Sequence, residues 1–128
     1  MRVAAVDDAN VERVRTFLLH HAETSLFLLS NLISYGPHLG AHINSGNYRY
    51  IEHEGRVVAV FVLTRRGNLL AHTGGRGDLV DPILGACAAE TMPVTGVVGE
   101  WSSAQALWRR LCATPGFVPG RALVGWSS

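Results

Sequence analysis

A glycine-rich segment, His72-Thr73-Gly74-Gly75-Arg76-Gly77, is the part of the sequence best suited to hold a ligand. It follows an apolar run that predicts a strand and precedes a run that predicts a helix. Glycine permits positive φ angles and close approach of a ligand to the backbone, and the N-terminus of a helix attracts anions. The segment therefore predicts a phosphate-binding loop. The alternative is a plain connection between a strand and a helix, because glycine-rich connections of this kind are common.

The six histidines raise the question of a metal site. His38 and His42 are four residues apart, but the proline and glycines around them argue against the helix that would align them. His20 and His21 are adjacent and would point in different directions on a helix. No acidic or cysteine ligand stands at a supporting spacing, so we expect no metal site.

The elements that must position these residues follow from hydrophobic periodicity. The pattern predicts six strands and four helices in the order β-α-α-β-β-β-α-β-α-β. This is an α/β (α+β) protein with a mixed, mostly antiparallel central sheet flanked by helices. The expected strands cover 2–6, 47–53, 56–64, 69–73, 94–98 and 117–126, and the expected helices cover 10–21, 25–35 with Thr24 as cap, 78–90 and 102–112.

Length and composition restrict the class of protein. A chain of 128 residues with 48% hydrophobic and 16% charged residues fits one folded domain, 1–128, and excludes intrinsic disorder. A net charge of +1 without a basic cluster argues against nucleic-acid binding. No apolar run is long enough to cross a membrane, and the first residues lack signal-peptide features, so we expect a cytoplasmic protein. Cys87 and Cys112 fall in expected helices and are predicted to be buried free thiols.

The element order and the segment 72–77 resemble the GNAT superfamily of N-acetyltransferases. The signature of that family, Gln/Arg-x-x-Gly-x-Gly/Ala, follows the fourth strand and opens a helix. The resemblance implies an acyl-CoA N-acyltransferase domain in which Gly74, Gly75, Arg76 and Gly77 hold the pyrophosphate of acetyl-CoA. The segment 26–32 also resembles the second helix in the N-terminal half of tandem GNAT proteins.

The same resemblance implies a reaction, the transfer of an acetyl group to the amine of a small molecule or peptide. A general base must then remove a proton from the amine. Glu100, at the end of the fifth strand, is the best-placed carboxylate, and His72 is the alternative base because the ordinary pKa of an imidazole is close to neutral pH. A solvated residue at a strand end, or a partner for an arginine, is the other interpretation of Glu100.

The chain also departs from the family pattern. His72 stands where the family has Gln or Arg, and Asp78 and Asp81 in the first turn of the helix would repel a pyrophosphate. The last expected helix has no tyrosine to act as general acid. The segment 117–126 would be a sixth strand, whereas a complete member has a seventh. These departures favour an alternative function, a non-catalytic GNAT-like module that forms a homodimer or packs on a second GNAT domain through this edge strand, which carries no charged side chain from Ala122 onward.

Overall fold

The computed structural model describes residues 2–21, 25–74, 76–90, 94–113 and 124–126. Strands and helices follow one another in the expected order, and a short 3-10 helix, η1, precedes α3. The strands are β1 (Arg2–Ala5), β2 (Gly46–His53), β3 (Arg56–Thr64), β4 (Asn68–His72), β5 (Gly96–Glu100) and β6 (Val124–Trp126). The helices are α1 (Val11–His20), α2 (Leu26–Tyr35), η1 (Gly77–Leu79), α3 (Val80–Ala88) and α4 (Trp101–Cys112).

The six strands form one sheet in which each strand lies beside its neighbours in the sequence. Pairing is antiparallel from β1 to β4 and parallel from β4 through β5 to β6. Parallel neighbours cannot be joined by a tight turn, so α3 and α4 serve as the connections after β4 and β5. The protein is therefore an α+β protein with a mostly antiparallel sheet, as expected. Of the predicted last strand, 117–126, only Val124–Trp126 lies within the described residues.

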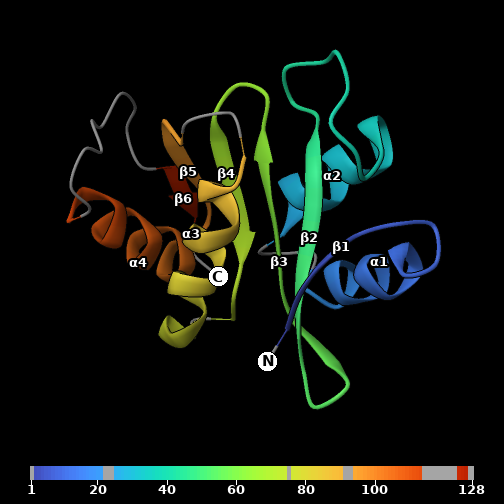
Figure 1. Ribbon diagram of the computed structural model, residues 1–128, viewed down its shortest axis with the longest axis horizontal. Coiled ribbons are helices and arrows are strands. Elements are labelled where there is room, and N and C mark those ends of the chain that lie inside the picture. The colour runs from blue at the N-terminus through green and yellow to red at the C-terminus, as the bar shows by residue number, and fades with distance from the viewer. Residues whose placement is uncertain (1, 22–24, 75, 91–93, 114–123, 127–128) are drawn as a thin grey trace.

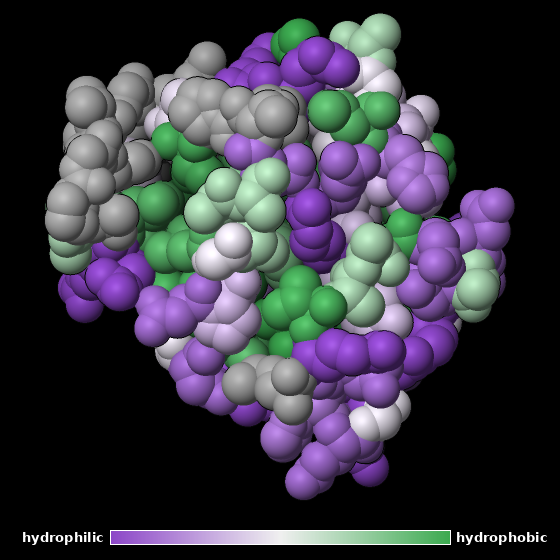
Figure 2. All heavy atoms as spheres, viewed as in Figure 1, coloured by the Kyte–Doolittle hydropathy of each residue, from purple (hydrophilic) through white to green (hydrophobic). Residues whose placement is uncertain are grey.

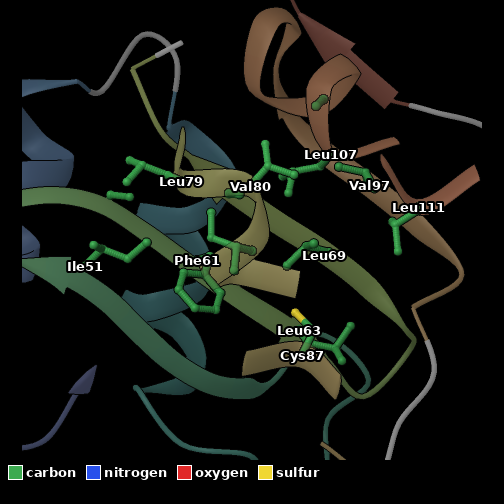
Figure 3. Close-up of a cluster of buried hydrophobic side chains, with 14 residues drawn as sticks. Ile51, Phe61, Leu63, Leu69, Leu79, Val80, Cys87, Val97, Leu107 and Leu111 are labelled. Carbon is green, nitrogen blue, oxygen red and sulfur yellow. The ribbon is translucent and has the colours of Figure 1, made fainter. Parts of the chain in front are cut away.

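Helices cover both faces of the sheet (Figure 1). The side chains of β3 alternate between the two layers, as the twofold repeat of a strand requires. Val60 and Val62 pack in a cluster with α1 and α2, whereas Phe61 and Leu63 pack in a cluster with α3 and α4. Figure 3 shows the second cluster, to which α3 and α4 contribute residues such as Ile83 and Leu107. A strand that is apolar on both faces therefore belongs at the centre of the sheet.

The surface of the protein is uneven in polarity. In the view of Figure 2, hydrophobic side chains gather on the side of α3 and α4, while the right and lower sides are largely hydrophilic. Large hydrophobic side chains are also exposed on α2, where Leu26 is 59%, Phe27 50% and Ile33 65% exposed. The helix α2 therefore presents apolar area to solvent beside its exposed serines, Ser30 and Ser34.

The buried hydroxyl of Tyr48 joins the sheet to a helix. Tyr48 is 1% exposed, and its Oη donates a hydrogen bond of 2.6 Å to the carbonyl oxygen of Leu28 in α2. Burial raises the pKa of Tyr48 well above the ordinary value for tyrosine. This hydrogen bond fixes the distance between β2 and α2 in the layer formed by the first two helices.

The prediction that the cysteines are buried is confirmed for one of the two. Cys87 in α3 is buried, but Cys112 at the end of α4 is exposed, so the prediction that both are buried was wrong for Cys112. The apolar positions of α4 recur up to Leu111, and the next residue along the helix turns away from that face. Burial raises the pKa of the Cys87 thiol to about 12.

Replacement of Tyr48 by Phe tests the hydrogen bond to Leu28. We expect the free energy of unfolding to fall by about 1 kcal/mol, the usual net value of one hydrogen bond, in urea denaturation. Tyr50→Phe is the control, because Tyr50 is equally buried and its hydroxyl has no hydrogen bond among the described residues. Equal losses in the two variants would contradict this assignment.

The difference between the thiols predicts their reactivity. At pH 8 the folded protein should react quickly with one equivalent of a thiol reagent such as 5,5′-dithiobis(2-nitrobenzoate), at Cys112. Cys87 should react only after unfolding, because its thiol is buried and remains protonated. Cys112→Ser should then abolish the fast phase in the folded protein, and a fast phase that persists in this variant would refute the prediction.

Candidate functional site

The glycine-rich loop leaves the carboxyl end of β4 and leads into η1 and α3. Gly74 has a φ of +62°, a conformation that side chains with a Cβ rarely adopt. Arg76 has an extended backbone, and its carbonyl oxygen accepts a hydrogen bond of 3.3 Å from the amide of Leu79. The helical turn begins at Gly77 as a 3-10 helix, one residue before the expected start. Gly75 lies outside the described residues.

The cation of this loop is paired with a neighbouring carboxylate. Arg76 Nε and Nη2 donate to Asp78 Oδ1 and Oδ2 over 3.2 and 2.7 Å. The hydrogen bond to Arg76 lowers the pKa of Asp78, and the same hydrogen bond raises the pKa of Arg76. The sequence predicts that Asp78 repels an anion. In the structure Asp78 also occupies the guanidinium group of Arg76, which would attract one.

The second acidic residue, Asp81, is turned towards the last helix. Its Oδ1 accepts a hydrogen bond of 3.0 Å from Arg110 Nε of α4, and both side chains are more than half exposed. The pair links α3 to α4 at the surface. Part of the negative charge at the start of α3 is therefore balanced by a residue 29 positions away.

His72, the alternative base, lies in the layer opposite α3. It follows Leu70 on the same face of β4, is 3% exposed, and packs against two rings of the first-helix segment. The ring centroids of His72 and His21 are 4.7 Å apart, and those of His72 and Phe17 are 5.6 Å apart. The sequence carries no signal that His21 and Phe17 lie against His72, because periodicity identifies the face of a helix but not the strand that this face covers.

Glu100 is brought next to His72 through the backbone. The parallel register pairs Ala71 with Gly99, so the residues that follow, His72 and Glu100, end adjacent strands at the same edge of the sheet. Neighbouring strands lie about 4.8 Å apart. Glu100 also pairs with Trp126 of β6. The structure thus unites the two candidate bases and the glycine loop at the carboxyl ends of β4 and β5.

Gly99 is required where these two strands approach each other. A Cβ atom at this position would lie 2.5 Å from the carbonyl oxygen of Ala71, a distance that real Cβ atoms do not show. Any larger residue would therefore separate β4 from β5 beside the candidate site.

The other histidines bear on the question of a metal site. Within residues 2–21, 25–74, 76–90, 94–113 and 124–126, no three His, Cys, Asp or Glu side chains are close enough to hold a metal ion. His42 lies in a loop, stacks on Tyr35 at 4.1 Å, and accepts a hydrogen bond from the amide of Asn44.

None of the helices in the described part of the chain has the length and apolar character needed to cross a bilayer.

Comparison with known proteins gives no relative. No protein-family model matches the chain, and no curated protein or solved structure matches it either.

Replacement of Gly99 by Ala tests the contact between β4 and β5. We expect the free energy of unfolding to fall by about 1–3 kcal/mol, because the added methyl group overlaps the carbonyl of Ala71. Gly85→Ala is the matched control: Gly85 lies on the exposed side of α3 with open space around it. That variant should gain about 0.5–1 kcal/mol from helix propensity. Urea denaturation measures both, and a neutral Gly99→Ala would contradict the close contact.

Proposed function

We propose that the chain is a GNAT-type N-acetyltransferase that transfers an acetyl group from acetyl-CoA to an amine. The observation that carries the proposal is the parallel pairing of β4 with β5, which brings a glycine loop and two candidate bases to one edge of the sheet. In sheets with parallel strands, ligands bind outside the carboxyl ends of those strands. The resemblance of the element order to the GNAT superfamily supports the same conclusion.

In this proposal the loop holds the pyrophosphate of acetyl-CoA. The first amides of a helix have no acceptor within the helix, and they face a ligand that approaches the loop. Gly74, Gly75 and Gly77 carry no side chain that would shield a backbone amide, and Arg76 supplies a guanidinium group once it separates from Asp78. Because Arg76 must give up the carboxylate of Asp78 before it pairs with the pyrophosphate, the coenzyme binds more weakly than it would to an unpaired arginine.

The acetyl transfer needs a base on the side where the amine arrives. The amine nitrogen attacks the thioester carbonyl carbon, the carbon–sulfur bond breaks, and the coenzyme thiolate takes up a proton. The proton that the amine loses goes to an imidazole nitrogen of His72 or to the carboxylate of Glu100. His72 lies in the layer of α1 and α2, so the amine would approach from that layer while the coenzyme binds next to α3.

A non-catalytic module is the second candidate function. The ion pair between Arg76 and Asp78 favours it, because this pair competes with a phosphate. The sequence of α4 contains no tyrosine that could act as general acid. In the sheet, β6 pairs with β5 and stands last in the strand order of the described residues. In this alternative the chain forms a homodimer or packs on a second GNAT domain through that edge.

Calorimetric and thermal titrations with acetyl-CoA separate the two functions. At one hundred times the Kd, a ligand that binds only the folded state stabilises it by about 2.7 kcal/mol. Acetyl-CoA binding, together with release of free coenzyme thiol in the presence of a panel of amines, would support the enzyme. Absence of binding, together with a dimer in light scattering, would support the module.

Asp78→Asn tests the role of the ion pair in the loop. We expect acetyl-CoA to bind a few-fold more tightly, because the substitution removes one negative charge and frees Arg76 for a phosphate. Asp8→Asn, an exposed position that precedes α1, is the control for net charge and should leave the affinity unchanged. Isothermal titration that gives equal or weaker binding for Asp78→Asn would contradict the proposed phosphate position.

The two candidate bases are tested separately from binding. His72→Gln or Glu100→Gln, whichever residue accepts the proton, should reduce acetyl transfer while acetyl-CoA binding is retained. A variant that retains both binding and transfer excludes its residue as the base. Circular dichroism must accompany His72→Gln, because His72 is buried in the layer of α1 and α2.

A further inference from the structure

A cavity lies at the other end of β4, next to α2. It has a volume of about 440 Å³, within the usual range for sites that hold small molecules. Its apolar surface comes from Leu70 of β4, Val98 of β5 and Phe27 of α2. Asn68, the first residue of β4, also lines it, whereas the glycine loop begins after the last residue of that strand. The two sites are therefore about 13 Å apart along the strand.

The polar lining of this cavity carries unused hydrogen-bonding capacity. The hydroxyl of Thr64 is bonded to the backbone of Asn68. The other four uncharged polar residues come from three elements: Ser30 and Asn31 from α2, Asn44 from the loop before β2, and Asn68 from β4. Among the described residues, none of these four side chains makes a hydrogen bond. Side chains of such different origin that converge on one cavity with their donors and acceptors available are typical of a ligand site.

The charge of the lining is positive. Arg66, in the turn between β3 and β4, is its cation, and none of the residues that line the cavity is acidic. The guanidinium group of Arg66 forms no ion pair with any described residue, in contrast to Arg76 and Arg110. A guanidinium group binds a carboxylate through two parallel hydrogen bonds.

The walls of the cavity are held by backbone hydrogen bonds. The amides of Arg65 and Arg66 donate to the carbonyl oxygens of Ser45 and Ile43 over 2.8 and 3.0 Å. The amide of Thr95, before β5, donates to the carbonyl oxygen of Gly67 over 2.8 Å. The backbone of the turn that carries Arg66 is thus fixed between the loop before β2 and the start of β5, so this wall of the cavity is in place before a ligand arrives.

We propose that this cavity binds a small monocarboxylate with a compact apolar body. The carboxylate pairs with Arg66, the asparagine amides bind its remaining lone pairs, and the apolar body rests on Leu70 and Val98. This site is separate from the proposed coenzyme loop and goes beyond the acetyl transfer proposed above.

Matched pairs of probes test the proposal. Phenylacetate and hexanoate should bind the full chain in ligand-detected NMR and calorimetry, whereas phenylacetamide and hexanamide, which have the same shape without the charge, should bind at least about tenfold more weakly. Equal binding of the acid and its amide would overturn the assignment of Arg66. Absence of binding by both carboxylates would overturn the site.

Variants locate the binding within the molecule. Arg66→Gln should weaken carboxylate binding at least about tenfold, and Ser30→Trp, which fills the cavity from the exposed side of α2, should abolish it. Arg109→Gln removes the same charge from α4, on the other face of the sheet, and should have no effect. Equal effects of Arg66→Gln and Arg109→Gln would overturn the proposal. Acetyl-CoA binding should be unchanged in Arg66→Gln, which separates this test from that of the coenzyme loop.

Discussion

The close contact between β4 and β5 is the constraint on which the candidate site depends. The backbone of Gly99 lies against the carbonyl of Ala71, and the parallel register that this contact permits aligns the ends of the two strands. If the register shifted by one residue, every side chain of β5 would change face, and Glu100 would no longer follow the partner of Ala71. The absence of a side chain at one position thus sets the geometry of a whole edge.

The sheet divides the edge into two chemically different layers. The glycine loop runs from β4 into η1 and α3, so its amides belong to the layer that Figure 3 shows. His72 points to the other layer, where Phe17 and His21 lie against it. Alternation along a single strand, β4, therefore separates the place for an anion from the place for a base. Two reactants that must meet at the sheet edge can approach it from opposite sides.

Charge near the loop is controlled by short-range pairing. Arg76 and Asp78 neutralise each other within one turn of chain, and Arg110 partly balances Asp81 across two helices. At the opposite end of β4, Arg66 has no such acidic neighbour among the residues that line its cavity. The two arginines therefore differ in availability although both lie in turns at the ends of the same strand. Whether an arginine can bind an anionic ligand depends on the nearest carboxylate. The net charge of the chain does not indicate this.

Periodicity and turn residues in the sequence determined the order of strands and helices and the position of the glycine loop, because these features depend on neighbours in the chain. Only the tertiary structure decided which distant residues meet. The contact of His72 with His21 and the pairing of Asp81 with Arg110 join residues 51 and 29 positions apart. The cavity at Arg66 brings together α2, β4 and β5. Such contacts depend on strand register and helix packing, which the hydrophobic periodicity of the sequence does not encode. The exposed Cys112 has the same cause, since burial depends on what covers a helix face.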